Sequence, residues 1–135
     1  MMHIEILGIP VPLARHRHFK MGSIVSTYDP QSKKKVEFQK KIKVKLLKVD
    51  IVELLKKETV ELTLTFGMPY PKSKVRKNMP CISTISHITK PDLDNLIKFV
   101  CDCGNGLLWS DDKKIIKINA KKNYMIEPKT IISIS

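Results

Sequence analysis

The spacing of hydrophobic residues predicts an α+β fold for this chain of 135 residues. Segments that we expect to form strands are 3–8, 60–66, 114–126 and 130–134. Two other segments, 31–55 and 94–103, repeat hydrophobic residues every three or four positions, which is typical of amphipathic helices. Their order along the chain predicts a mixed, mostly antiparallel sheet with two main helices packed on one face.

The length of the chain limits the number of domains, and its charge limits the kinds of partner that it can bind. The chain is long enough for one hydrophobic core and contains no linker, so we expect a single domain over residues 1–135. Its net charge of +12 favours polyanionic partners, with a membrane surface as the competing partner. No apolar run approaches the roughly 20 residues of a membrane-spanning helix, and the N-terminus lacks the features of a signal peptide. We therefore expect a cytoplasmic protein that binds nucleic acid.

The most basic part of the chain is the helix predicted over residues 31–55. Its recurring hydrophobic residues are Phe38, Ile42, Leu46 and Val49. The lysines between them either form a solvated helix face or contact DNA. Residues 41–46 also alternate as a strand does, which leaves that alternative open.

Two irregular segments carry further basic residues. One follows the first predicted strand and contains Pro10 and Pro12, and the other is the long segment 67–90. Loops as long as the second are usually functional or mobile in a compact domain. We therefore consider both segments when looking for contacts with DNA.

The three cysteines, an odd number, fit a reducing compartment better than a disulfide framework. A zinc site could be drawn from Cys101 and Cys103 with Cys81 and His87. Residues two apart in a helix, however, point about 200° away from each other. We therefore interpret the cysteines as small buried hydrophobic residues.

Four acids lie close together in this basic chain. They are Asp92, Asp94, Asp111 and Asp112. Acids held near one another repel unless a proton or a cation lies between them, and carboxylate oxygens are natural ligands of Mg²⁺. Because a basic surface favours nucleic acid, this combination suggests a metal-dependent nuclease.

The helix predicted over residues 94–103 has two different faces. The hydrophobic stripe consists of Leu96, Phe99, Val100 and Cys103, and the polar face of Asp94, Lys98 and Asp102. If residues 92–94 are extended, Asp92 and Asp94 point the same way and Leu93 points into the core. The helix N-terminus would add amide donors beside a bound anion.

A glycine turn at residues 104–106 follows this helix, and residues 107–109 form an apolar anchor. We expect the turn to bring Asp111 and Asp112 back toward the helix start. Three carboxylates from the two segments would then hold Mg²⁺. Lys98 would contact the scissile phosphate or stabilise the leaving oxygen.

Each of these residues also has a structural interpretation. Asp92 or Asp94 can cap the helix, and Lys98 can pair with an acid one turn away. Asp111 and Asp112 can be turn residues before a strand. Only the whole set, with its acids converging, indicates a nuclease.

The set resembles the RusA family, Holliday junction endodeoxyribonucleases of bacteria and their phages. The most specific part of the resemblance is His87-Ile88-Thr89-Lys90-Pro91-Asp92-Leu93-Asp94-Asn95-Leu96-Ile97-Lys98, then Asp102, Asn105-Gly106 and Trp109-Ser110-Asp111-Asp112. Further likeness to phage-type members is found at Pro10-Val11-Pro12, Arg15, Arg17 and Tyr28. The likeness therefore extends over most of the chain.

The resemblance implies a single RusA-like domain that forms a homodimeric, Mg²⁺-dependent resolvase, in which Mn²⁺ can substitute. Such an enzyme nicks two opposed strands of a four-way DNA junction, whose two-fold symmetry suits a symmetric dimer. The catalytic acids and metal ligands carry over onto Asp92, Asp94 and Asp112, and the catalytic lysine onto Lys98. The spacing leaves open whether Asp111 takes the place of Asp112.

Phosphate contacts would dominate recognition of the junction, with base contacts secondary. The residues expected to contact the DNA backbone are Arg15, Arg17, Lys72, Lys74 and Arg76. Each of them is equally well explained as a solvated loop charge. We expect Trp109 to pack the helix against the sheet rather than to stack on a base, and His87 to form a structural hydrogen bond.

Two other functions fit the same residues. The first is a non-catalytic basic nucleic-acid-binding protein in which the acids cap helices and turns. The second is a nuclease for branched or flap DNA without junction preference. The first predicts salt-sensitive binding without cleavage, and the second predicts cleavage without paired nicks.

Overall fold

A four-stranded sheet forms the centre of the computed structural model, which describes residues 2–14, 17–22, 24–28, 30–47, 49, 51–71 and 85–135. The strands, in spatial order, are β1 (Met2–Leu7), β6 (Lys129–Ile134), β4 (Val60–Pro69) and β5 (Ile115–Met125). β6 pairs antiparallel with both β1 and β4, whereas β4 and β5 run parallel. The predicted α+β fold with a mostly antiparallel sheet is confirmed.

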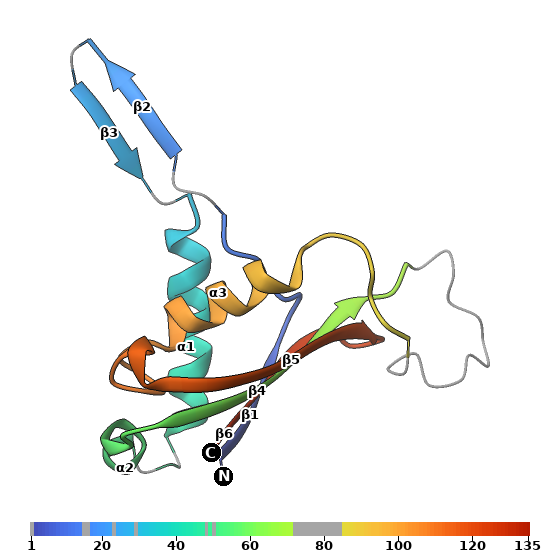
Figure 1. The fold of residues 1–135 in the computed structure, drawn as a ribbon. Helices are drawn as coiled ribbons and strands as arrows, with labels where there is room; N and C mark the ends of the chain where they lie inside the picture. Colours follow the sequence, from blue (N-terminus) through green and yellow to red (C-terminus); the bar gives the residue numbers. More distant parts are fainter. Residues whose placement is uncertain are drawn as a thin grey trace.

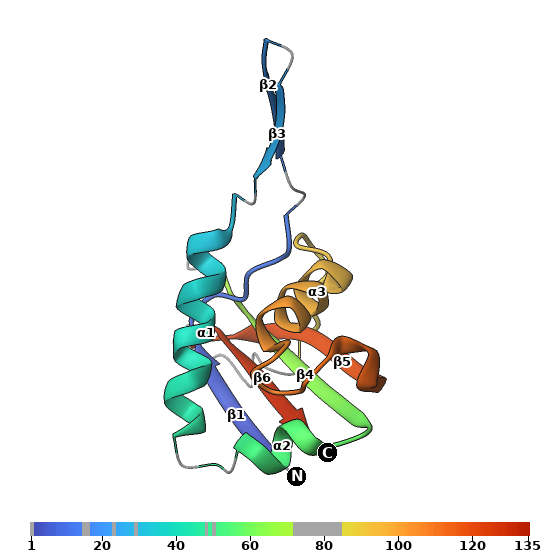
Figure 2. The same cartoon turned by 90° about the vertical axis from the view of Figure 1, so that its left-hand side faces the viewer.

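Helices α1 (Ser32–Leu46) and α3 (Leu93–Gly104) cover one face of this sheet and contact each other; they cross in Figure 1 and lie next to each other in Figure 2. The predicted hydrophobic positions that are buried are Phe38, Ile42 and Leu46 on α1 and Leu96, Phe99, Val100 and Cys103 on α3. Phe38 and Phe99 meet edge to face with ring centroids 5.5 Å apart. The two helices therefore share one core with the sheet, and the strand alternative for residues 41–46 is wrong.

The helix predicted over residues 31–55 is in fact two helices, because α1 ends at Leu46 and α2 (Ile51–Lys56) begins a few residues later. Fifteen residues give α1 a length of about 22 Å, similar to the roughly 20 Å of the six-residue strand β1. A single straight helix over residues 31–55 would be about 37 Å long and would run past β1. The break instead allows Leu54 of α2 to be buried.

A two-stranded hairpin, β2 (Arg17–Met21) and β3 (Ile24–Tyr28), extends away from the rest of the fold in Figure 1. Sequence analysis predicted only a loop here. The signal that would have revealed the hairpin is Gly22-Ser23, a favourable two-residue connection between strands. Gly22 has φ of +62°, a conformation that favours glycine, and Met21 pairs with Ile24 across the turn.

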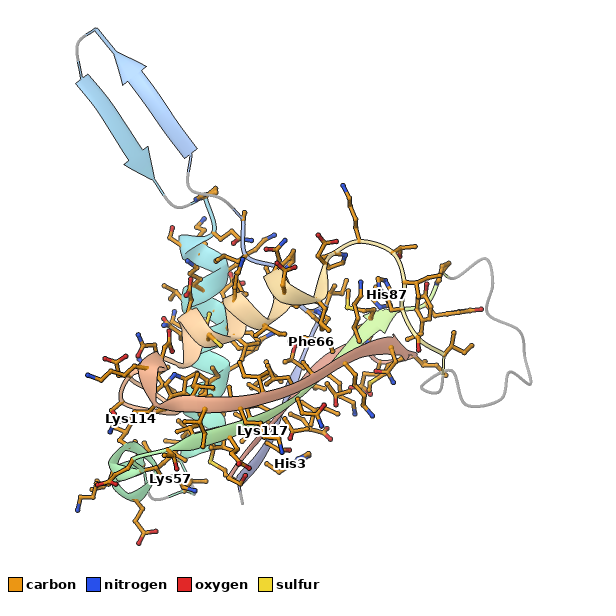
Figure 3. The ribbon with its side chains drawn as sticks, in the orientation of Figure 1. His3, Lys57, Phe66, His87, Lys114 and Lys117 are labelled. Carbon is orange, nitrogen blue, oxygen red and sulfur yellow. The ribbon has the colours of Figure 1, made fainter. Side chains whose placement is uncertain are left out.

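The face of the sheet opposite the helices is polar. His3 and Lys117 lie on this side in Figure 3, and Lys117 pairs with the exposed Glu61 in the β4–β5 register. No helix in the described part of the chain combines the length and the apolar character needed to cross a membrane.

Candidate active site

The start of α3 presents two acids and a lysine to solvent. Asp92 precedes the helix in an extended conformation (φ −71°, ψ 143°), and its side chain makes no capping hydrogen bond. Asp94 lies in the first turn, and its Oδ2 is 3.6 Å from Nζ of Lys98. All three side chains are exposed, with 67% exposure for Asp94 and 60% for Lys98. Both acids are therefore accessible to a ligand, and the Asp92 carboxylate does not cap the helix.

Asp112 lies at the other end of α3, beside its last turn. The helix ends at Gly104, where an added Cβ would come within 2.6 Å of the ring of Trp109. Trp109 is fully buried, as predicted, and its Nε1 donates a hydrogen bond of 2.6 Å to Oδ1 of Asp112. The close contact with Gly104 thus fixes Trp109, and Trp109 fixes Asp112.

Asp111 has the structural role that the sequence left open. Its Oδ1 accepts a hydrogen bond of 3.0 Å from the main-chain nitrogen of Lys113, and this caps the short 3-10 helix Asp112–Lys114. Its Oδ2 is 4.0 Å from Nζ of Lys113. Asp111 therefore caps the 3-10 helix, whereas Asp112 accepts the hydrogen bond from Trp109.

The prediction that Asp111 and Asp112 return to the start of α3 is wrong: in a single copy of the chain they lie at the opposite end of this helix. The charge of Asp112 acts on Cys101 in the last turns of α3. Seven residues separate Cys101 from Asp94, about 10 Å along a helix axis, whereas ligand oxygens of one Mg²⁺ lie about 4 Å apart or less. Across the residues that the structure describes, no three His, Cys, Asp or Glu side chains form a group that could hold a metal ion. Figure 3 shows this separation: Lys114, which follows Asp112, lies far from His87, which precedes the start of α3.

The parallel pairing of β4 and β5 explains this separation. A crossover helix between parallel strands runs opposite to them, so its C-terminus lies near the start of the second strand. Residues just before β5 must therefore lie at the C-terminal end of α3. The glycine turn by itself predicted a return to the helix start, but the direction in which two strands pair is decided by tertiary contacts.

The segment that leads into α3 is held by β5. The main-chain nitrogen of His87 donates to the carbonyl oxygen of Lys122 (3.2 Å), and the nitrogen of Tyr124 donates to the carbonyl of Ile85 (3.0 Å). Nζ of Lys122 donates to the carbonyl oxygens of Thr89 (2.5 Å) and Pro91 (2.6 Å). The Lys90–Pro91 peptide bond is cis. Lys122 was not among the predicted site residues, although strand alternation places it on the same face as Ala120 and Tyr124.

His87 is buried under this segment. Its Nε2 lies 3.2 Å from Oγ1 of Thr89, and its ring meets that of Tyr124 with centroids 4.9 Å apart. Burial, followed by the nearby charge of Lys122, lowers the pKa of His87 below its ordinary value. The imidazole is therefore neutral at pH 7, and the predicted structural hydrogen bond is confirmed.

A groove next to Asp92 separates this segment from the N-terminal loop. Gln31 holds the loop by donating to the carbonyl of Pro12 and accepting from the nitrogen of Ala14, both at 2.7 Å. The nitrogen of Leu13 donates to the carbonyl of Asn95 on α3 (2.8 Å). The open groove has a volume of about 440 Å³, and its lining residues are Pro12, Leu13, Lys90, Pro91, Asp92 and Asn95.

The predicted DNA-contacting residues are only partly covered by the structure. Arg17 opens strand β2 of the projecting hairpin. The predicted residues that lie outside the described part of the chain are Arg15, Lys72, Lys74 and Arg76, together with Cys81 of the zinc alternative. Cys103 is buried and Cys101 is half-buried, as expected for structural cysteines.

Cys101 provides a test of where Asp112 lies. Burial, then the charges of Asp112 and Asp102, raise the pKa of the Cys101 thiol to about 11. Only about one thiol in a thousand is then the reactive thiolate at pH 8. Replacing Asp112 by Asn removes a negative charge, so the pKa falls and alkylation of Cys101 accelerates several-fold. Peptide mapping after iodoacetamide treatment in metal-free buffer measures the rate. Asp111→Asn serves as the control and leaves it unchanged.

A strongly basic protein favours nucleic-acid partners, and exposed carboxylates are natural ligands of Mg²⁺, so this acidic helix start suits a nuclease that acts on DNA. The particular family follows from a comparison with family models. The model described as "Endodeoxyribonuclease RusA" matches residues 8–135, nearly the whole chain. The chain belongs to the RusA family of endodeoxyribonucleases.

Among curated proteins, the chain is similar to "Uncharacterized protein YqaN" of Bacillus subtilis (strain 168). The two are 34% identical over 70 residues. This match covers 49% of the chain and 49% of the relative, so the chain spans about half the length of the curated relative that it matches.

Proposed function

We propose that this protein is a Mg²⁺-dependent, structure-selective endodeoxyribonuclease that resolves Holliday junctions by paired symmetric nicks during DNA recombination and repair. The observation that carries the proposal is the exposed acidic start of α3, with Asp92 and Asp94 beside Lys98, in a RusA-family chain of net charge +12. A dimer would present two such sites to the two-fold symmetric junction.

The residues present at the start of α3 fit a magnesium ion. Mg²⁺ is usually bound by one or two carboxylates, retains several waters and accepts substrate phosphate oxygens as further ligands. Asp92 and Asp94 are exposed and offer such oxygens. The bound ion would activate water and neutralise charge on the phosphodiester. We propose Asp92, Asp94 and Asp112 as its ligands, the last from a second copy of the chain.

Lys98 would act on the phosphate rather than on the metal. Its Nζ extends from the second turn of α3 toward Asp94 and is exposed. An ammonium group in that place would neutralise charge that develops on the scissile phosphate or the leaving oxygen. The amide groups at the start of α3 add positive potential on the same side.

The free edge of β5 supports a homodimer in which the acids meet. Residues 85–87 pair with residues 122–124 on the outer edge of β5, and no other part of the described chain pairs with that edge over residues 115–121. Ile116 and Ile118 are 63% and 40% exposed there. An open strand edge with exposed hydrophobic residues is suited to pairing with another chain.

Two-fold antiparallel pairing along this open edge would bring opposite ends of the two β5 strands together. Asp112 lies just before the start of β5, whereas Lys122 near the other end is bonded to the segment that leads to Asp92. Asp112 of one protomer would therefore approach Asp92 and Asp94 of its partner. The separation of the acids within one chain is then the reason for a dimer.

A cleavage assay tests the function. A synthetic four-way junction, a flap and a duplex of matched sequence are each incubated with the protein in Mg²⁺, Mn²⁺ or EDTA. We expect paired, symmetric nicks in the junction with either metal and none in EDTA. Salt-sensitive binding without cleavage would instead support a non-catalytic binder. Cleavage of the flap at an equal rate would support a branched-DNA nuclease without junction preference.

A further inference from the structure

The segment that ends at Asp92 is anchored by a lysine from a different part of the chain. We propose that Lys122 of β5 is a positioning residue for the nuclease reaction, because its ammonium group fixes residues 89–91 and thereby sets where the Asp92 carboxylate lies. The inference rests on the proposed function, since it assigns a further residue to the same site.

The register of the sheet shows why Lys122 is unusual. It pairs with Phe66 of β4, so its side chain lies on the face that the helices cover, and it is half-buried. The neighbouring Lys121 pairs with Thr65, lies on the opposite face and is exposed. A partly buried ammonium group requires hydrogen-bond acceptors to offset its lost hydration.

Lys122 finds its acceptors in the segment before α3. Its Nζ donates to the carbonyl oxygens of Thr89 and Pro91 at 2.5 and 2.6 Å, on either side of Lys90. Carbonyl groups of an irregular segment have no helix or sheet partner of their own and need one from elsewhere. Hydrogen bonds from a charged donor are stronger than those between neutral groups. The Lys122 side chain thus supplies the two hydrogen bonds that these carbonyl groups would receive from the main chain in a helix or a sheet.

The main chain of Lys122 holds the same segment at its beginning. Its carbonyl oxygen accepts from the nitrogen of His87 at 3.2 Å, and His87 in turn contacts Thr89 through Nε2. The ring of Tyr124, two residues along β5, packs against His87. Residues 87–91 are therefore tied to β5 at both ends, and both ties pass through Lys122.

Asp92 depends on this arrangement because its own side chain does not fix it. It follows Pro91 directly, is exposed and makes no capping hydrogen bond to α3. The position of its carboxylate is thus set by the backbone that Lys122 holds. A displacement of about 1 Å at a reacting group can reduce turnover by about 100-fold.

The test compares Lys122→Met with Lys57→Met, which removes the same charge from an exposed lysine just beyond the end of α2 and outside the open edge of β5. For Lys122→Met we expect faster hydrogen exchange at the amides of residues 87–92. We expect turnover on a saturating four-way junction to fall by about 100-fold, with the junction Kd within about twofold of wild type. Lys57→Met should change neither measurement. Lys122→Arg retains the charge and the donors, so it should restore most of the turnover.

Each other outcome contradicts the inference. Unchanged exchange in Lys122→Met would show that the lysine does not order the segment. Faster exchange with full turnover would show that the ordering does not matter for the reaction, and a weakened Kd alone would make Lys122 a DNA contact. If the wild-type protein does not nick DNA, the proposed function fails, and the exchange measurement alone still decides whether Lys122 orders the segment.

Discussion

Replacement of Asp92 by Asn should reduce nicking of a four-way junction by about 1,000-fold, the effect of losing several kcal/mol of metal-dependent stabilisation. Asn retains the size of the side chain but removes the charge that a magnesium ligand needs. Asp92 is exposed and caps nothing, so folding should be unaffected. Junction binding should be equal or slightly tighter because one negative charge is lost. Single-turnover cleavage and gel-shift titration measure the two quantities separately.

Asp102→Asn is a matched control for this experiment. Asp102 lies on the same helix and is also exposed, but its Oδ2 is 3.4 Å from Nζ of Lys35 on α1. The substitution removes the same charge eight to ten residues along α3 from Asp94 and Asp92. Because Asp102 is paired with Lys35 and is not a proposed ligand, nicking should remain within about twofold of wild type. Full activity of Asp92→Asn would remove the proposed mechanism.

A mixture of two inactive variants should recover activity if the metal site is shared between protomers. Asp92→Asn and Asp112→Asn each lose both sites of their own homodimer. In a mixed dimer, one site combines the intact Asp92 of one chain with the intact Asp112 of the other. Random pairing of equal amounts then restores about a quarter of the wild-type sites. Co-refolding the two variants, with a different tag on each, gives the mixed dimer for the nicking assay.

The products of this mixture distinguish the possible arrangements. A mixed dimer with one intact site should nick a junction on one strand instead of making paired nicks. If all ligands came from one chain, every site in the mixture would contain a substitution and no activity would return. Asn at position 112 retains an oxygen that can accept the hydrogen bond from Trp109, so the fold should persist. Thermal denaturation of each variant checks this point.

The local elements could be predicted well because hydrophobic periodicity is a local property. The stripe on α3 from Leu96 to Cys103 is buried as its spacing indicates. Strand β4 alternates as predicted but continues to Pro69, three residues further. The break between α1 and α2 was missed because the hydrophobic spacing continues beyond Leu46, although α1 is already as long as β1.

Hydrogen bonds between distant segments could not be predicted in the same way. Lys122 and Pro91 are 31 residues apart, and no sequence pattern in either segment predicts the hydrogen bond between them. The contact exists because residues 85–87 pair along the outer edge of β5 and place the next residues beside Lys122. The hairpin β2–β3 could have been predicted, because Gly22-Ser23 is a local sequence signal for a two-residue turn between strands.

The amino-acid sequence by itself determined that the chain is basic, that its strands and helices form an α+β fold, and that acids cluster around one amphipathic helix. Only the tertiary structure decided that Asp112 lies at the opposite end of α3 from Asp92 and Asp94. The physical reason is the direction of β5: a strand parallel to β4 must begin where the crossover helix ends. Side-chain spacing reports which residues face a core, whereas strand direction depends on which edges pair across the whole molecule.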